Sequence, residues 1–285
     1  MTEYKQDSPL LLGVIGDPIH HSKSPAMHGA ALAALGIAGA YVPMHVKPEA
    51  LEAAVQGIRA LGFRGINVTI PHKVAVMPFL DRLDESARDA GAVNTIVNDN
   101  GILTGFNTDG IGYVRSLKAE AAPDLRGARI LVLGAGGAAK GIVTALLREQ
   151  PGGVVIANRT SDKARELAEA CQGKGVVAGI GQAEIADAVQ QADIVINTTS
   201  VGMYPHIDDT PMDTQLLRPG MIVSDLIYNP LRTRLLLESL ERGCMIHGGL
   251  GMFVNQGAYA LEYWTGLPAP TDVMRRIILE SLGGN

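Results

Sequence analysis

The sequence predicts an α/β fold divided into two domains. Short apolar runs alternate with helix-like segments along the 285-residue chain, which is the pattern of a sheet covered by helices. Residues 130–140, which read ILVLGAGGAAK, place a glycine cluster between an apolar run and a helix-forming segment. Over a hundred residues precede this cluster, so a complete α/β unit is expected to come before it.

The first part of the chain is expected to alternate strands and helices. Ser24 is the expected N-cap of the first helix, with Pro25 at its first helical position. A hairpin is expected to turn around residues 98–101. The expected strands are residues 11–15, 41–46, 65–69, 95–98 and 102–105, and the expected helices are residues 24–35, 49–61 and 84–91, with a short helix from Pro71.

The second part is expected to begin near Ala128, after a helix that follows Asp109. Its first strand leads into the glycine cluster, and an apolar helix follows. Further strands are expected at residues 154–157, 193–197 and 221–225, and the last helices at residues 252–264 and 272–282.

The glycine cluster matches a dinucleotide-binding fingerprint. Gly134 allows a tight turn, Gly136 lets the backbone approach a pyrophosphate, and the small Ala139 lets helix and strand pack closely. The helix that follows offers free N–H groups and a partial positive charge to phosphate. An ordinary glycine turn is the alternative. It ranks below dinucleotide binding because a strand and a helix flank the motif in the required order.

The end of the second strand of this unit indicates which dinucleotide binds. NAD-binding units usually place an acidic residue there, on the ribose hydroxyls. This chain has Asn158, Arg159 and Thr160, and the planar fork of an arginine suits a 2′-phosphate. Lys163 adds positive charge nearby. The alternative is a solvated loop with two cations, but the position of Arg159 at the end of the strand favours NADP.

Composition and charge disfavour several other classes of protein. The formal net charge of −5 argues against a general nucleic-acid-binding surface. The N-terminal MTEYKQD lacks a basic region, and the apolar run that follows is too short for a signal peptide or a membrane span. Cys171 and Cys244 lie outside any metal-type spacing and are typical of reduced thiols in a cytoplasmic protein. No metal site is expected, and a homodimer is one candidate assembly among those that the sequence leaves open.

Two polar clusters follow predicted strands of the first part. Ser22 and Ser24, beside a helix N-terminus, could make a carboxylate site, although the local sequence alone favours a capped helix start. Lys73 ends the run NVTIPHK in a first helical turn, where the helix dipole disfavours a cation. A lysine there can supply positive charge or a proton to a developing alkoxide, and a solvated surface lysine is the alternative.

Three further polar residues lie in short motifs. Asn94 belongs to AVNT and Asp109 to NTDG, and turn chemistry and helix capping are their structural alternatives. Gln256 shares a helical face with Met252, Tyr259 and Tyr263. A glutamine on such an apolar stripe needs a partner, which is either a neighbour or a ligand.

Taken together and in chain order, these segments resemble shikimate dehydrogenases over nearly the whole chain. Each motif alone is ambiguous, whereas the joint pattern is specific. The matching segments are Ser22-Lys23-Ser24-Pro25, NVTIPHK ending at Lys73, AVNT ending at Thr95, NTDG ending at Gly110, GAGGAA from Gly134, NRT from Asn158, DLIYNP containing Tyr228, and QGAYALEYWTG from Gln256.

The resemblance implies an enzyme that reversibly reduces 3-dehydroshikimate to shikimate with NADPH, on the route to aromatic amino acids. It implies an N-terminal substrate domain over residues 1–109 and a Rossmann-type NADP-binding domain over residues 110–249. Residues 250–285 would return to the substrate domain, and the active site would lie in the cleft between the domains.

The resemblance also implies roles for individual residues. Lys73 and Asp109 would be the catalytic pair. Ser22 and Ser24 would hold the substrate carboxylate. The residues expected at ring hydroxyls are Thr69, Asn94, Asp109 and Gln256, with Lys73 also touching the substrate and Tyr228 contacting it from the cofactor side. The residues expected at NADP are Gly134, Ala135, Gly136, Gly137, Ala138, Asn158, Arg159, Thr160, Lys163, Thr198 and Gly249.

Two other functions are weighed against this one. A quinate/shikimate dehydrogenase with broader substrate and cofactor use would fit an acidic residue at position 158 or 159 better than Arg159. A non-catalytic NADP-binding sensor could lose Lys73 or Asp109 without penalty, and this chain has both.

Overall fold

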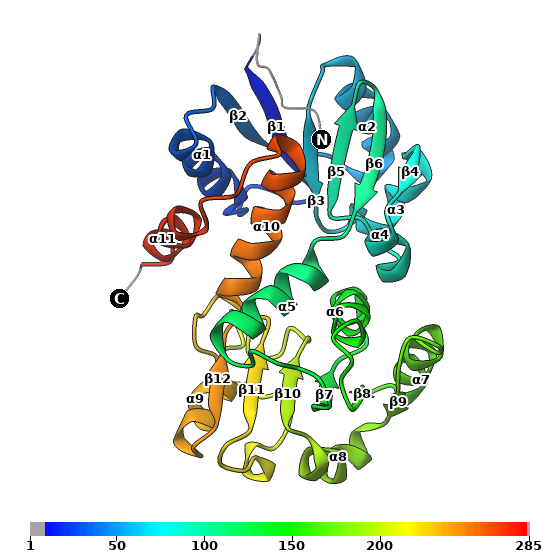
Figure 1. Cartoon of the computed structure of the whole chain (residues 1–285), viewed down its shortest axis with the longest axis vertical. Helices are drawn as coiled ribbons and strands as arrows, with labels where there is room; N and C mark the ends of the chain where they lie inside the picture. Colours follow the sequence, from blue (N-terminus) through cyan, green and yellow to red (C-terminus); the bar gives the residue numbers. More distant parts are fainter. Residues whose placement is uncertain (1–8, 284–285) are drawn as a thin grey trace. The chain divides into compact units, whose positions relative to one another are not determined.

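The computed structural model describes residues 9–283, which form two compact units, each with its own sheet (Figure 1). The first unit runs to Thr108 and resumes at Val254, and the second runs from Asp109 to Phe253. The segment MTEYKQD, whose sequence argues against a signal peptide, lies outside the described residues. Within residues 9–283, no helix has the length and apolar character that a membrane span requires.

The first unit contains a mixed six-stranded sheet with the strand order β2-β1-β3-β5-β6-β4. β2 and β3 run parallel to β1, β5 runs antiparallel to its neighbours β3 and β6, and β4 is parallel to β6. The predicted hairpin is confirmed, and Asn100 and Gly101 both have the positive φ that a tight hairpin turn requires. The strands are β1 (Leu10–Gly16), β2 (Gly39–His45), β3 (Gly65–Val68), β4 (Arg82–Leu83), β5 (Thr95–Asp99) and β6 (Ile102–Phe106).

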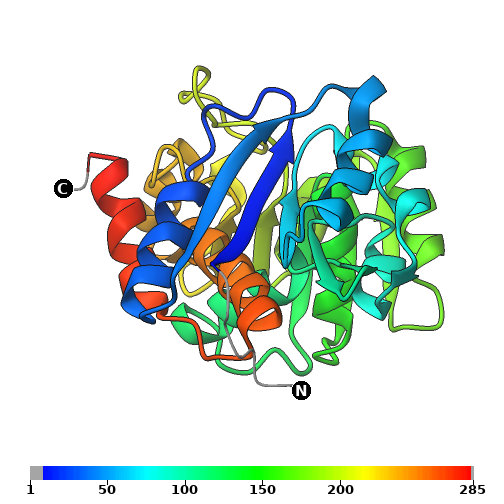
Figure 2. The same ribbon diagram turned by 90° about the horizontal axis from the view of Figure 1, so that it is seen from above.

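Helices lie on both faces of this sheet (Figure 2). On one face, Ile15 and Ile66 pack with Val55 of α2. On the other, His28 of α1 and Trp264 of α10 lie against Tyr41 of β2. The helices are α1 (Ser24–Ala34), α2 (Leu51–Ala60), α3 (His72–Ala75), α4 (Glu85–Ala90), α11 (Thr271–Ser281) and α10 (Leu250–Thr265), which belongs to this unit from Val254 onward.

A glycine in β3 permits the close approach of α10 to the sheet. The indole Nε1 of Trp264 donates a hydrogen bond of 2.9 Å to the carbonyl oxygen of Ile96. A Cβ atom on Gly65 would lie 2.1 Å from that nitrogen. Any larger residue at position 65 would therefore displace the indole and the helix that carries it.

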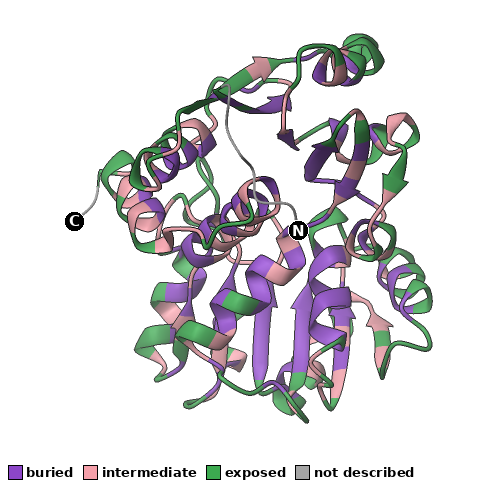
Figure 3. Cartoon of the chain, turned by 45° about the horizontal axis from the view of Figure 1, so that its top comes forward, coloured by how far each residue is buried: buried purple, intermediate pink, exposed green. Residues whose placement is uncertain are grey.

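The second unit contains a parallel six-stranded sheet with the order β12-β11-β10-β7-β8-β9. Counted within this unit and read from β9, the order is third, second, first, fourth, fifth and sixth, which is the Rossmann arrangement. Its central strands are buried over most of their length (Figure 3). The strands are β7 (Arg129–Leu133), β8 (Gly153–Ala157), β9 (Val177–Ile180), β10 (Ile194–Asn197), β11 (Ile222–Asp225) and β12 (Met245–His247).

Helices also cover both faces of the second sheet. Leu117, Ile142 and Leu167, from α5, α6 and α7, share one apolar cluster with Val132. Val189 of α8 and Leu235 of α9 belong to the cluster on the opposite face. The helices are α5 (Asp109–Glu120), α6 (Gly137–Leu147), α7 (Ser161–Ala170), α8 (Ile185–Gln191) and α9 (Arg234–Glu241). The predicted α/β class is confirmed.

Two predictions about helix starts are wrong. Lys23 is the N-cap of α1, and Ser24 is its first helical residue. Asp109 is likewise the first residue of α5 rather than the cap before it. In addition, the helix expected from position 49 starts as a 3₁₀ turn, Pro48–Ala50, and becomes α2 at Leu51. The capping role fails for Ser24 because no side-chain bond caps this helix.

Candidate active site

The polar clusters of the first unit gather at one edge of its sheet. β1, β3 and β6 point the same way, so the segments that follow them meet at that edge. β5 runs the opposite way, so the residue before its start lies at the same edge. The segments brought together are the β1–α1 turn with Ser22 and Ser24, the β3–α3 turn with Thr69 and Lys73, Asn94 before β5, and Asn107 with Thr108 after β6.

The β1–α1 turn places its two serines side by side. The backbone N–H of Ser24 donates a hydrogen bond of 3.3 Å to Oγ of Ser22. Ser24 is largely buried, and its side chain forms a hydrogen bond with the phenol of Tyr41. Ser22 is half-buried. Hydroxyl groups at a helix N-terminus suit a carboxylate, and the carboxylate-binding role of these serines stays a prediction.

Several hydrogen bonds hold the side chain of Asn94. Its side chain is buried, and its Nδ2 donates a 2.9 Å hydrogen bond to Oγ1 of Thr108. Its Oδ1 accepts from the Thr108 backbone N–H at 2.8 Å and from the Thr95 hydroxyl at 3.0 Å. Asn94 therefore fixes the residue that directly precedes Asp109 in the chain.

The β3–α3 turn carries Thr69 and Lys73. His72, between them, is buried and its Nε2 lies 2.6 Å from the carbonyl oxygen of Val46. The carbonyl oxygen of Lys73 accepts a 2.8 Å hydrogen bond from the backbone N–H of Val93. The lysine backbone is thus tied to the segment that leads to Asn94, and both Thr69 and Lys73 are half-buried.

Gln256 lies on α10, as its spacing predicted. The next residue, Gly257, faces α1, and a Cβ there would lie 2.3 Å from the terminal methyl of Met27. Tyr263, on the helical face of Gln256, packs on Phe106 with ring centroids 4.7 Å apart. Gln256 is half-buried on a helix that is held against the sheet at several points.

In the second unit, the β7–α6 turn has the geometry that the fingerprint requires. Gly134 has a φ of +107°, and a Cβ on it would lie 2.6 Å from Oγ1 of Thr198. Gly136 is the N-cap of α6 and has nothing within 4 Å of the position where a Cβ would be. Ala139 is fully buried against the sheet. The first turn of α6, residues 136–138, is exposed, so its backbone N–H groups can receive a phosphate.

The end of β8 presents Asn158, Arg159 and Thr160. The Asn158 side chain donates a 2.9 Å hydrogen bond to the carbonyl oxygen of Thr160, which is the N-cap residue of α7. Arg159 and Lys163 are exposed. In the described part of the chain, neither cation forms an ion pair, so both charges are available to an anion.

A buried carboxylate anchors the loop that leads to Tyr228. Asp225 accepts hydrogen bonds from Asn197 at 3.1 Å, Thr233 at 2.7 Å and the backbone N–H of Ile227 at 3.0 Å. Burial raises the pKa of Asp225, and these three donors oppose that rise. The ring of Tyr228 stacks on Phe253 with centroids 4.7 Å apart.

Gly249 packs against the loop that follows β11 in the second unit. Its backbone N–H donates a 3.2 Å hydrogen bond to the carbonyl oxygen of Ile227. A Cβ on Gly249 would lie 2.0 Å from the carbonyl oxygen of Leu226, so only glycine fits there. This close backbone approach is a structural reason for the glycine, and its contact with NADP stays a prediction.

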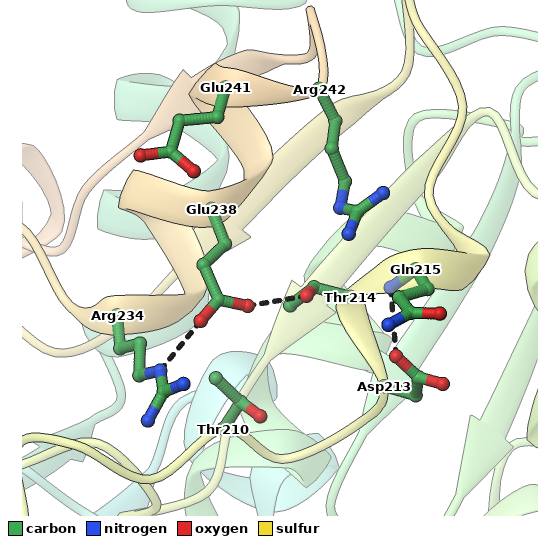
Figure 4. A pocket seen from close by; sticks show the side chains of 8 residues that line it. All are labelled: Thr210, Asp213, Thr214, Gln215, Arg234, Glu238, Glu241 and Arg242. Carbon is green, nitrogen blue, oxygen red and sulfur yellow. Dashed lines mark hydrogen bonds and ion pairs between the residues drawn. The ribbon is translucent and has the colours of Figure 1, made fainter.

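The second unit also has a polar hollow of about 660 Å³ beside α9 (Figure 4). Glu238 in its lining forms an ion pair with Arg234 and accepts a hydrogen bond from the Thr214 hydroxyl. None of its lining residues belongs to the motifs described above. Within residues 9–283, no group of three or more histidine, cysteine, aspartate or glutamate side chains could hold a metal ion.

Sequence reasoning gave no role to several buried polar residues at the sheet edge. Asn67, Thr95 and Thr108 lie inside the motifs NVTIPHK, AVNT and NTDG, and Tyr41 lies in β2. The available signal was a polar residue inside an apolar strand, as in Ile66-Asn67-Val68, because a buried polar side chain needs a partner.

Three family models match successive parts of the chain. The shikimate dehydrogenase substrate binding domain matches residues 14–96, which lie in the first unit. The shikimate / quinate 5-dehydrogenase model matches residues 116–215, in the second unit. The shikimate 5′-dehydrogenase C-terminal domain matches residues 249–279.

Individual relatives resemble the chain over nearly its whole length. The NADP(+) shikimate dehydrogenase of Moorella thermoacetica is 48% identical, with 96% of this chain and 94% of the relative covered. The shikimate 5-dehydrogenase of Listeria monocytogenes, solved with shikimate and NAD, has a TM-score of 0.90 at 38% identity and covers 98% and 99% of the two chains. The Thermus thermophilus enzyme, solved with NADP(H) and shikimate, has a TM-score of 0.86 at 36% identity and covers 96% and 100%. The chain therefore belongs to the shikimate dehydrogenase family.

Proposed function

We propose that this chain catalyses the reversible NADPH-dependent reduction of 3-dehydroshikimate to shikimate, a step toward the aromatic amino acids. The observation that carries the proposal is the 48% identity, over 96% of the chain, to a curated NADP(+) shikimate dehydrogenase. The arrangement of polar residues at the edge of the first sheet and the fingerprint turn in the second unit are consistent with this activity.

The second unit fits NADP. The positive φ of Gly134, the open space at Gly136 and the exposed first turn of α6 form a cradle that a larger side chain would fill. Arg159 and Lys163 supply two exposed cations for the 2′-phosphate. The residues that we assign to NADP are Gly134, Ala135, Gly136, Gly137, Ala138, Asn158, Arg159, Thr160, Lys163, Thr198 and Gly249. When bound as NADPH, the cofactor supplies the hydride for the ketone carbon.

The substrate is a small anion with one ketone and several hydroxyls. We assign its carboxylate to Ser22 and Ser24. We assign its ring hydroxyls to the polar side chains that follow the strands and to α10. These are Thr69, Asn94, Asp109 and Gln256, with Tyr228 as a further contact. Asp109 and Tyr228 belong to the second unit. The domain roles follow, with the first unit binding substrate and the second binding NADP.

Lys73 and Asp109 are the proposed catalytic pair. Reduction of the ketone builds negative charge on its oxygen, and a proton must neutralise that charge. The Lys73 ammonium stabilises the developing charge, and Asp109 keeps the lysine charged and oriented. Together the pair supplies the proton that converts the alkoxide to the alcohol.

Substitution of the pair tests the proposal. Lys73→Ala should lower kcat by about 10²–10⁴-fold, which is the usual contribution of a positioned acid or base. Asp109→Asn should also impair turnover severely. Lys47→Ala, at an exposed lysine of the same unit, is the matched control and should retain parental turnover. A Lys73→Ala protein that turns over within a few-fold of the parent would remove Lys73 from the chemistry.

The alternatives have their own outcomes. A quinate/shikimate dehydrogenase would oxidise quinate with NAD as readily as shikimate with NADP, and the exposed Arg159 argues against it. A sensor would bind NADP in calorimetry and turn nothing over. We also propose a cytoplasmic location, supported by two buried free cysteines, and a homodimer, which the molar mass in solution would test.

A further inference from the structure

Asn94 is held by a chain of buried hydrogen bonds that begins three strands away on β2. The hydroxyl of Tyr41 donates to Oδ1 of Asn67 on β3 at 2.7 Å. The Asn67 Nδ2 group donates to the backbone carbonyl oxygen of Asn94 and to the Thr95 hydroxyl, each at 3.0 Å. Thr95 in turn donates to Oδ1 of Asn94 at 3.0 Å. All of these side chains are buried.

The direction of each bond in this chain is fixed by groups that have only one role. A backbone carbonyl oxygen can only accept, so the end of Asn67 that faces the Asn94 carbonyl is the nitrogen. The Thr95 hydroxyl accepts from that nitrogen, and its own hydrogen is directed to Asn94 Oδ1. The backbone N–H of Thr108 can only donate, and it reaches the same Oδ1 at 2.8 Å.

The start of the chain is held rigidly. The Tyr41 ring stacks on His28 with centroids 4.4 Å apart and an interplanar angle of 6°. Trp264 lies on the same cluster, with its centroid 6.2 Å from that of Tyr41. Burial lowers the pKa of His28 to about 3, so this neighbour stays neutral at ordinary pH. The phenol hydroxyl is therefore placed by packing, and its hydrogen is committed to Asn67.

We propose that Asn67 and Thr95 are positioning residues that fix the orientation of the Asn94 amide, so that Asn94 meets the substrate as a hydrogen-bond donor. Its Oδ1 is bound from inside the protein by Thr95 and Thr108, so Nδ2 is the donating end. The substrate group held by Asn94 must then accept, as the oxygen of a ring hydroxyl does. This inference rests on the proposed function, because it presumes that Asn94 binds substrate.

Removal of one hydroxyl tests the proposal. Thr95→Val keeps the shape of the buried side chain and deletes the link to Asn94. The KM for shikimate should rise about three- to tenfold, the effect of one hydrogen bond, while the KM for NADP stays near that of the parent. Thr95→Ser keeps the hydroxyl and should restore the parental value. Thr144→Val removes a buried hydroxyl that donates to the Lys140 carbonyl oxygen within α6 and is the matched control.

A double-mutant cycle separates positioning from a general loss of packing. If Thr95 acts through Asn94, Thr95→Val should have no further effect on the KM for shikimate in an Asn94→Ala background. Additive losses, or equal rises in both KM values, would overturn the proposal. So would a Thr95→Ser variant that behaves like Thr95→Val.

A readout that does not use activity keeps this proposal separate from the proposed function. A crystal structure at a resolution that shows hydrogens distinguishes the oxygen from the nitrogen of the Asn94 side-chain amide. The proposal requires Oδ1 toward Thr95 and the Thr108 N–H, and the opposite orientation would contradict it. If the parent turns over no shikimate while this orientation is observed, the catalytic assignment fails and the hydrogen-bond chain stands.

Discussion

Arg159 is the residue on which the choice between NADP and NAD depends. Its guanidinium is exposed at the end of β8, next to the N-terminus of α7. A hydrogen bond to a charged group contributes about 1.5–3 kcal/mol to binding. Arg159→Ala should therefore lower the affinity for NADPH about ten- to a hundredfold. NADH lacks the 2′-phosphate, and its kcat/KM should change little. The measurement is the ratio of kcat/KM for NADPH to that for NADH.

A neighbouring arginine provides the control for that measurement. Arg165 lies on α7, is also exposed, and pairs with Asp162 at 3.4 Å. Arg165→Ala should leave the cofactor ratio unchanged. Arg159→Ala together with Lys163→Ala should lower the ratio further than the single change. An unaltered ratio in the Arg159 variant would show that Arg159 does not bind the phosphate.

His28 is a buried imidazole whose titration should be visible in stability. Burial lowers its pKa from 6.5 to about 3, so below pH 6.5 the unfolded chain binds a proton that the folded chain does not. The free energy of unfolding should therefore fall as pH decreases from 6.5 toward 3, by up to about 1.4 kcal/mol per pH unit from this group.

The His28 contribution is measured by comparison with a variant. His28→Leu removes the titrating group, so its unfolding free energy should fall less steeply between pH 6.5 and 4 than that of the parent. The carboxylates are common to both proteins and cancel in the difference. Parallel pH profiles for the two proteins would mean that His28 is already protonated in the folded state, or that its site admits water.

At the scale of elements, the β7–α6 turn contains two glycines with different roles. Gly134 is needed for the fold and for NADP, whereas Gly136 is needed for NADP alone. Gly134→Ala places a Cβ 2.6 Å from Thr198 Oγ1 at a positive φ, and should cost about 1–3 kcal/mol of stability as well as NADP affinity. The Cβ of Gly136→Ala would meet nothing within 4 Å, so this variant should lose less than about 1 kcal/mol of stability. Its affinity for NADP should still fall.

Melting temperature and NADP affinity, measured on both variants, test this separation. The expected result is a clear loss of melting temperature for Gly134→Ala alone and a loss of affinity for both. If Gly136→Ala binds NADP as the parent does, the backbone of this turn does not approach the cofactor. If Gly134→Ala melts with the parent, the positive φ is not required.

The elements that were predicted are those whose apolar pattern is set locally. β7 and α6 are almost continuously apolar and flank a glycine turn, and the β5–β6 hairpin has Asn100-Gly101 at its turn. β9 and β12 were not predicted because they are short edge strands that are only partly buried, so neither has a clear alternation. α9 was also missed, although Leu235, Leu236 and Ser239 of its sequence form a buried helical face.

In the site, too, the residues within local motifs were predicted, whereas the contacts between residues far apart in the sequence were not. The motifs located Ser24, Lys73, Asn94 and the fingerprint, because each is a short pattern next to the end or the start of a strand. They did not give the hydrogen-bond chain from Tyr41 to Asn94. Tyr41 and Asn67 are 26 residues apart in the sequence, and Asn67 and Asn94 are 27 apart. The sheet brings them together from β2, β3 and the segment before β5. A buried polar residue signals that a partner exists but does not say which one.

At the scale of the whole molecule, we infer that this chain oxidises shikimate with NADP. Two units with separate sheets carry the residues assigned to the two ligands, and the family extends over both. Substitutions at the substrate residues of the first unit should therefore leave the KM for NADP near its parental value, and substitutions at the NADP residues of the second unit should leave the KM for shikimate near its parental value.

The most direct test is an initial-rate assay that follows the absorbance of reduced nicotinamide. The purified full chain is supplied with shikimate or quinate, and with NADP or NAD. We expect reduction of NADP that depends on shikimate, with kcat/KM at least about tenfold above that for NAD and a much smaller rate with quinate. A folded protein that binds NADP but does not reduce it with shikimate, or one that uses quinate and NAD equally well, would contradict the claim.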